Sequence, residues 1–228
     1  MVGAGRLAPG CWLEMLHTAL VASEPTWLVW TRALQTIAQS GLNYASDEYD
    51  LERYRDVRRI AAELAAAHTD VDAELIEGLF AANSGHPTPK IDVRAAVIVS
   101  QRILLVRERS DAGWALPGGW ADPGESPSEA VVRETREEAG VDVRATKLIA
   151  LYDRARQGHP PHSEYIYKAI FACDPLGPGT PRASGETDGA DFFDPTGLPE
   201  LSAGRTTPAQ IARAFEHHAD SSLATDFD

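Results

Sequence analysis

Three glutamates, Glu134, Glu137 and Glu138, are spaced so that a helix would present them together. At about 100° per residue, their side chains fall within an arc of roughly 100°. The opposite side of the same helix would pack on a core, since it carries Val131, Val132, Thr135 and Ala139. Like charges at these spacings weaken a helix. The acidic face therefore predicts either a bound cation or a merely solvated surface.

Capping residues define both ends of this predicted helix. Ser126, Pro127 and Glu129 fit the N-cap, N1 and N3 positions of a capping box with proline at N1. Gly140 is suited to end the helix, because glycine adopts the left-handed conformation of a C-cap without strain. We therefore predict a helix that begins after Ser126 and ends before Gly140.

The turn ahead of this helix is suited to contact a ligand. Residues 116–121 read LPGGWA, and the backbone at Gly118 and Gly119 can approach a ligand closely because it carries no Cβ atoms. Glu125 lies just before the N-cap. We take the two glycines as candidate substrate-binding residues and Glu125 as a further acid of the same site.

The stretch from Gly119 to Val141 resembles the signature of the Nudix hydrolases, G-x5-E-x7-R-E-U-x-E-E-x-G-U, in which U is a bulky aliphatic residue. The fixed and U positions are filled, in order, by Gly119, Glu125, Arg133, Glu134, Thr135, Glu137, Glu138, Gly140 and Val141. Thr135 departs from the pattern, at a packing position. The resemblance implies hydrolysis of the pyrophosphate bond of a nucleoside diphosphate that is linked to another moiety.

The resemblance also implies roles for the signature residues. A diphosphate repels a bare acidic site, so the carboxylates are expected to bind Mg2+ or Mn2+. Glu134 and Glu138 are the expected direct ligands, and Glu137 is expected to bind directly or through water. Arg133 is expected to hold the acids in place by pairing with Glu137 or with Glu125.

Helical periodicity predicts three helices between residues 25 and 84. The first begins near Trp27 with Gly41 as its C-cap, the second covers about 51–67 with Asp50 as N-cap, and the third covers about 72–82.

Residues 34–64 are similar to the helical N-terminal domain of a Nudix subgroup that includes CDP-choline and ADP-ribose pyrophosphatases. This resemblance implies a homodimer formed through the domain. Tyr44, Tyr49 and Tyr54 could line a nucleotide pocket there, but packing in a core or an interface is the favoured alternative.

A late acidic segment, residues 185–191 (GETDGAD), is a candidate for completing the site. In many Nudix enzymes a glutamate from a late loop adds a metal ligand or the general base. Where this subgroup would have a second glutamate about three residues after Glu186, the chain has Gly189. We expect Glu186 or Asp188 to take this role, or a carboxylate of the signature helix to act as the base.

The segment 153–168 is rich in basic residues in an otherwise acidic chain, which suggests a substrate-binding loop. Arg154 and Lys168 are the candidates for phosphate oxygens, and Tyr165 or Tyr167 could stack on a base. A solvated loop with ordinary charges at strand ends explains the same residues equally well.

Composition limits the class of partner. The chain has 228 residues, with 21 basic against 34 acidic residues and a formal net charge of −13. This balance argues against broad binding to nucleic acid or an anionic membrane. Two cysteines are too few for a disulfide framework or a zinc site, and no apolar run approaches a membrane span. We expect a cytoplasmic protein whose residues 1–24 form a disordered extension.

Beyond a proline-bearing connector at residues 84–90, the pattern becomes strand-like. It predicts a hairpin at 93–106, further strands at 147–152, 165–173 and 191–193, and a last helix from Thr207 to about His218. These elements predict an α/β protein, with an α/β/α sandwich and mixed sheet of Nudix type after a small helical domain. The predicted domain limits are 25–84 for the helical domain, 90–219 for the Nudix domain and 220–228 for a mobile acidic tail.

We therefore predict a Mg2+-dependent Nudix pyrophosphohydrolase acting on ADP-ribose or CDP-choline, with a nucleoside monophosphate and a phosphorylated compound as products. A non-catalytic, nucleotide-sensing regulator is one alternative, which the intact signature carboxylates disfavour. An exonuclease acting on the 3′ ends of short RNA is another, which the net charge disfavours.

Overall fold

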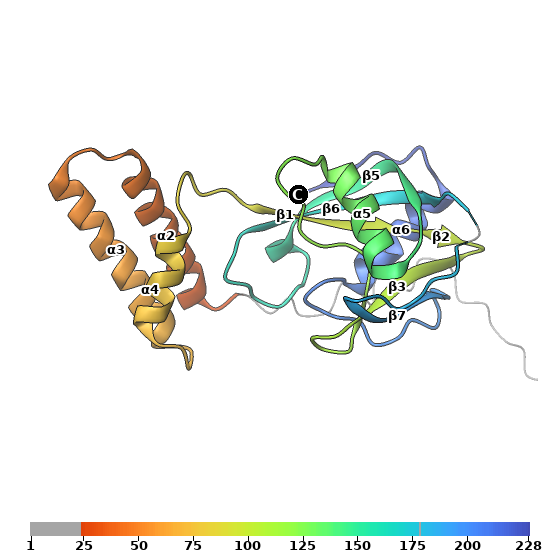
Figure 1. Cartoon of the computed structure of the whole chain (residues 1–228), viewed down its shortest axis with the longest axis horizontal. Coiled ribbons are helices and arrows are strands. Elements are labelled where there is room, and N and C mark those ends of the chain that lie inside the picture. The colour runs from red at the N-terminus through yellow and green to blue at the C-terminus, as the bar shows by residue number, and fades with distance from the viewer. Residues whose placement is uncertain (1–23, 178) are drawn as a thin grey trace, which may run out of the picture.

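The computed structural model describes residues 24–177 and 179–228, which form a helical domain followed by a sheet domain (Figure 1). The helical domain consists of α2 (Thr26–Tyr44), α3 (Glu48–Ala66) and α4 (Ala73–Ala82). The extension expected at residues 1–24 lies outside the described residues, apart from Glu24. Within the described ranges, no helix is both long and apolar enough to cross a membrane.

Two predictions for the helical domain are corrected by how α2 packs on α3. Gly41 does not end α2, which continues to Tyr44, and a Cβ atom at Gly41 would lie 2.3 Å from the ring of Tyr54. Gly41 is therefore the residue that lets the two helices approach. The N-cap of α3 is Asp47 and not Asp50, since the Asp47 carboxylate accepts hydrogen bonds from the amides of Tyr49 and Asp50.

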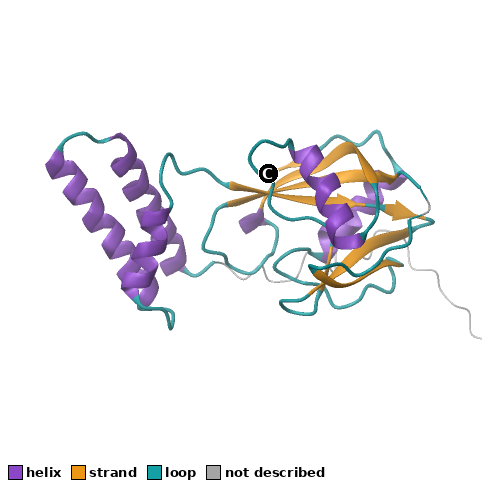
Figure 2. Cartoon of the chain, in the orientation of Figure 1, coloured by secondary structure: helices purple, strands orange, loops and turns teal. Residues whose placement is uncertain are grey.

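The sheet domain contains two sheets (Figure 2). In the first, the strand order is β1 (Lys90–Ala96), β6 (Ile166–Pro175), β5 (Val143–Asp153) and β8 (Asp226–Phe227), with β5 antiparallel to β6 and the other two pairs parallel. In the second, β3 (Arg102–Glu108) is antiparallel to each of β2 (Ile98–Val99), β4 (Trp114–Ala115) and β7 (Thr187–Phe193). The expectation of a mobile tail at 220–228 is wrong at β8, which pairs with β5.

Helices cover opposite faces of these sheets, and the alternation of residues along β3 shows why. Leu104 and Val106 belong to a core that includes residues of α5 (Pro127–Ala139), whereas Ile103 and Leu105 belong to a core that includes residues of α6 (Pro208–Ala219). Because successive strand residues point to opposite faces, one apolar strand contributes to both cores. The predicted α/β/α sandwich is confirmed. A short 3-10 helix, η1 (Arg154–Arg156), follows β5.

Candidate active site

The loop before α5 lies along β1 and is held by backbone hydrogen bonds. The amides of Val93 and Ala95 donate to the carbonyls of Gly119 and Pro117, each at 2.8 Å. Gly118 lies between these two bonds with φ of +139°, and a Cβ atom there would lie 1.9 Å from the Val93 carbonyl oxygen. Only glycine fits this position. Its amide donates to Glu138 Oε2 at 2.7 Å, so the loop directly orients a signature carboxylate.

The predicted limits of α5 are confirmed. The Ser126 hydroxyl accepts from the Glu129 amide, and the Glu129 carboxylate accepts from the Ser126 amide at 2.8 Å. At the other end, Gly140 has φ of +67°. Both ends are therefore fixed by local interactions, which gives the acidic side chains of α5 a defined orientation.

Three carboxylates converge beside this loop. Oxygen atoms of Glu134 and Glu138 on α5 and of Glu186 in the connection before β7 all lie within 4.8 Å of one another. Glu186 is brought to α5 by its neighbour, because the Thr187 hydroxyl donates to the Glu138 carbonyl at 2.6 Å. Asp188, the other late candidate, instead pairs with Arg109 at 3.0 Å.

Arg133 binds the outer acids of the signature. Its guanidinium donates to both carboxylate oxygens of Glu125 at 3.1 and 2.7 Å, and to Glu134 and Glu137 at 3.0 and 2.8 Å. These bonds lower the pKa of Glu125 to about 2. Arg133 thus joins both partners that the sequence suggested. Glu137 lies outside the three-carboxylate group, with its side chain 45% exposed, so its part in metal binding stays a prediction.

The electrostatics of the group fit a bound cation. Burial raises the pKa of Glu138 to about 7, the charges of Glu108 and Glu134 add to this rise, and Arg94 and the Gly118 amide oppose it. Burial likewise raises the pKa of Glu134. Negative charge is therefore insufficiently balanced by the protein at this position. An all-oxygen set of carboxylates suits a hard divalent cation such as Mg2+.

Lys168, predicted to bind phosphate, is instead buried in an ion-pair network. Its Nζ donates to Asp92 Oδ2 at 2.6 Å and its side chain is fully buried. Arg94 donates to both oxygens of the same carboxylate at 2.7 and 3.3 Å, and to the Leu116 carbonyl at 3.1 Å. Burial would raise the pKa of Asp92, but the two cations hold it below its usual value. A lysine so enclosed supports the loop and does not reach a ligand directly.

Arg154 also has a structural environment, which corrects its predicted contact with substrate. It is buried and donates to the carbonyls of Pro160 at 2.7 Å and Gly204 at 3.3 Å, closing the segment that follows β5. Tyr165 is exposed, but the guanidinium of Arg32 on α2 lies 4.9 Å from its ring centroid. Its predicted stacking on a base stays a prediction.

Two residues near the carboxylates, Glu108 and Arg205, were missed by the sequence interpretation. Glu108 ends β3, is 7% exposed, and pairs with Arg205 at 2.8 Å. The available signal was weak, because a glutamate at the end of an apolar strand usually faces solvent.

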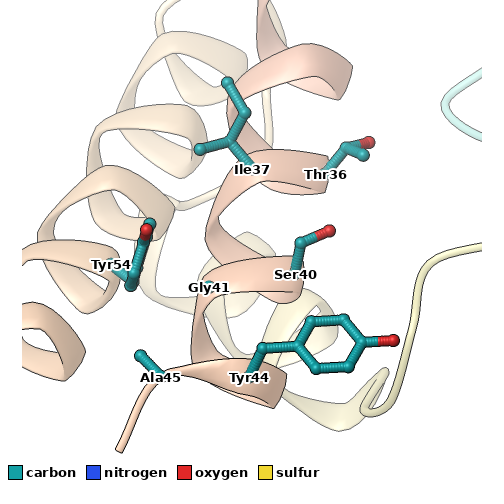
Figure 3. Close-up of a pocket in the computed structure, with 7 residues that line it drawn as sticks. All are labelled: Thr36, Ile37, Ser40, Gly41, Tyr44, Ala45 and Tyr54. Carbon is teal, nitrogen blue, oxygen red and sulfur yellow. The ribbon is translucent and has the colours of Figure 1, made fainter. Parts of the chain in front are cut away.

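An open groove of about 500 Å³ lies between α2 and α3, away from the carboxylates (Figure 3). Gly41, Tyr44 and Tyr54 are among the residues that line it, with Tyr54 facing Gly41. Tyr44 and Tyr49 are exposed. The groove is therefore a feature of the helical domain and not of the acidic site.

Comparison with known proteins accounts for both domains. Residues 25–80 match a family described as the UDP-X-like, N-terminal oligomerisation domain, and residues 88–215 match the NUDIX domain. YjhB of Bacillus subtilis, provisionally named an ADP-ribose pyrophosphatase, is 39% identical over 209 residues, which cover 92% of this chain and 100% of that protein.

Solved structures agree. An ADP-ribose pyrophosphatase from Streptococcus suis has 38% identity and a TM-score of 0.57, covering 62% of this chain and 100% of that chain. A UDP-X diphosphatase has 30% identity and a TM-score of 0.57, covering 89% of this chain and 98% of that chain. The NUDIX match covers more than half of the sequence and contains α5 with its carboxylates. The chain therefore belongs to the Nudix family and is a pyrophosphohydrolase.

Proposed function

We propose that this enzyme hydrolyses the pyrophosphate bond of ADP-ribose or a related nucleoside diphosphate derivative, using Mg2+ or Mn2+. The observation that carries the proposal is the convergence of Glu134, Glu138 and Glu186 within 4.8 Å. The names of the relatives from Bacillus subtilis and Streptococcus suis favour ADP-ribose. The products would be a nucleoside monophosphate and a phosphorylated second compound.

Each acidic residue has a part in this proposal. Glu134 and Glu138 would hold the divalent cation, which when bound supplies positive charge to the phosphoryl oxygens and acidifies a water molecule. The Gly118 amide holds Glu138, and Arg133 holds Glu134, so that both carboxylates keep their orientation. Glu186 is exposed beside them and would accept the proton of the attacking water. Asp188 is less suited, since Arg109 already binds it.

A UDP-linked substrate is the second candidate. The UDP-X diphosphatase structure resembles this chain over both domains, and the match to the helical domain is also described as UDP-X-like. CDP-choline remains a third candidate from the sequence resemblance.

We also propose that the helical domain forms a homodimer. Trp30, Ile37 and Tyr44 follow one another at intervals of seven residues on α2, and their side chains are 60%, 53% and 69% exposed. Such a row of exposed apolar side chains is typical of an interaction surface. The description of the matched family as an oligomerisation domain supports a second copy as the partner.

The test is a panel of ADP-ribose, UDP-glucose, CDP-choline and a short RNA, each incubated with Mg2+ or Mn2+ and analysed by product mass. We expect a nucleoside monophosphate from at least one of the nucleoside diphosphate derivatives. Glu138→Gln should lose both Mn2+ binding and turnover, whereas Glu186→Gln should lose turnover and keep most Mn2+ binding. Asp188→Asn serves as the matched control and should stay active.

The outcomes separate the alternatives. Nucleotide binding without turnover in the wild type would favour the regulator, and shortening of RNA alone would favour the exonuclease. Full activity of Glu138→Gln would contradict the assignment of the metal site.

A further inference from the structure

Arg205 lies in the segment between β7 and α6 and is linked to the acidic site by one buried carboxylate. Its Nε lies 2.8 Å from Oε1 of Glu108, the last residue of β3. Glu108 pairs across the sheet with Thr187, the residue that follows Glu186. Glu108 thus connects Arg205 to the strand that begins directly after Glu186.

Glu108 lies close enough to the site to share its electrostatic field. Its charge contributes to the raised pKa of Glu138, and burial raises the pKa of Glu108 itself, against the opposing charges of Arg205 and Arg94. A buried carboxyl beside other carboxylates keeps its charge more readily when a cation lies nearby. Arg205 supplies one such cation and is thereby held at the edge of the acidic group.

The way in which Arg205 is held leaves hydrogen-bond donors available. The Nε contact with Glu108 is an ion pair without an aligned hydrogen bond, since Glu108 Oε1 has no hydrogen-bond partner among the described residues. Nη1 lies 3.5 Å from the Ser202 hydroxyl, at the limit of a hydrogen bond, and Nη2 has no partner in the described part of the chain. The side chain is 36% exposed. Its outer edge is therefore accessible to a ligand.

Other arginines around the site use their donors on the protein. Arg94 binds both oxygens of Asp92 and a carbonyl, and is buried. Arg133 binds three carboxylates of the signature, and Arg109 binds Asp188 and two carbonyls. Arg205 differs from these three because its contacts are one ion pair, with Glu108, and one long hydrogen bond to Ser202, beside the charge of Asp111, whose pKa it lowers.

We propose that Arg205 binds a non-bridging phosphoryl oxygen of the diphosphate through its Nη groups, and that Glu108 is the positioning residue for its guanidinium. The planar guanidinium can donate two hydrogen bonds to a phosphoryl group while Nε stays on a carboxylate. This inference rests on the proposed function, because it requires a diphosphate at the acidic site. It assigns specificity for the diphosphate group to the segment before α6.

The test compares Arg205→Ala, Arg205→Lys and Glu108→Gln with the wild type. Arg144→Ala is the matched control, because Arg144 is 68% exposed on β5 and pairs only loosely with Asp174, at 3.5 Å. Three quantities are measured: kcat/KM for the best nucleotide of the panel, the Kd of inorganic pyrophosphate with Mn2+ present, and the Kd of Mn2+ alone.

For Arg205→Ala we expect kcat/KM to fall about 10- to 100-fold, as is typical for loss of a charged hydrogen bond. Pyrophosphate affinity should fall similarly. The Kd of Mn2+ alone should change less than about twofold, because a positively charged guanidinium is not a ligand of the metal ion. Added guanidinium ion should restore part of the activity, and Arg205→Lys should retain part of it. Glu108→Gln should have a smaller effect that disappears in the Arg205→Ala background.

Wild-type pyrophosphate affinity in Arg205→Ala would overturn the inference. So would an equal loss of Mn2+ and pyrophosphate binding without guanidinium rescue, because that result indicates a structural role. If the wild type hydrolyses none of the nucleotides, the proposed function fails, while the pyrophosphate and Mn2+ measurements still decide the role of Arg205.

Discussion

Replacing Gly118 by alanine should damage folding and metal binding together. At φ of +139° a residue with a Cβ atom costs about 1–3 kcal/mol in backbone strain. The Cβ atom would also lie 1.9 Å from the Val93 carbonyl oxygen, so the loop must move away from β1. That movement weakens the two backbone bonds at 2.8 Å, each contributing about 0.5–1.5 kcal/mol. The sum is a loss of about 2–6 kcal/mol in the free energy of unfolding.

The same movement withdraws the Gly118 amide from Glu138, so Mn2+ affinity should fall in the folded variant. Gly124→Ala is the matched control in the same loop. Gly124 also has positive φ, +97°, but a Cβ atom added there would meet no heavy atom within 4 Å beyond its chain neighbours. It should therefore lose only about 1–2 kcal/mol, from strain. Guanidinium chloride denaturation and Mn2+ titration measure both effects, and equal losses in the two variants would refute the argument from the Val93 contact.

Three further predictions concern burial and association. Asp92→Asn should lower the free energy of unfolding by about 3–5 kcal/mol, since it leaves two buried cations without their carboxylate. Lys168→Met should lower the stability less than Asp92→Asn does, because Arg94 still neutralises Asp92. Thermal denaturation of both variants measures this, and a larger loss for Lys168→Met would contradict the ion-pair network. His159 is buried, and burial lowers its pKa to about 4, below the unfolded value of about 6.5. The unfolded chain then binds more protons between these values, so about 3 kcal/mol of stability present above pH 6.5 is lost as the pH falls to 4. His159→Gln should flatten this dependence in urea denaturation at several pH values, whereas a variant with the wild-type slope would count against it. Trp30→Glu should convert a dimer to a monomer in sedimentation velocity, and an unchanged dimer would exclude α2 as the interface.

Local signals in the sequence predicted the elements that depend on neighbouring residues. The limits of α5 followed from Ser126, Glu129 and Gly140, because capping is decided within a few residues of a helix end. Gly41 misled because the same residue type that ends helices also permits close packing, and its partner Tyr54 lies on another helix. The glycine alone could not distinguish a helix end from a packing contact, because the deciding partner, Tyr54, is not a neighbour of Gly41 in the sequence.

Buried charge was the part of the site that sequence could not show. Asp92 and Arg94 alternate with apolar residues, a pattern typical of a strand with one solvated face, yet both are buried. Their burial depends on Lys168, which reaches Asp92 through the parallel pairing of β1 with β6, 76 residues away. Glu186 could be named as a candidate, but its selection over Asp188 depends on the contact of Thr187 with Glu138.

The pairing of β8 with β5 also bears on solubility. Without it, the outer side of β5 would present unpaired amides and carbonyls, the kind of edge on which strands of other molecules can add. Residues 226 and 227 occupy this edge, and the Asp226 carboxylate fastens them by accepting hydrogen bonds from Arg213 and Tyr152. Two residues of strand, secured by side chains of α6 and β5, thus protect the edge of β5 at Ala150 and Leu151 against intermolecular pairing.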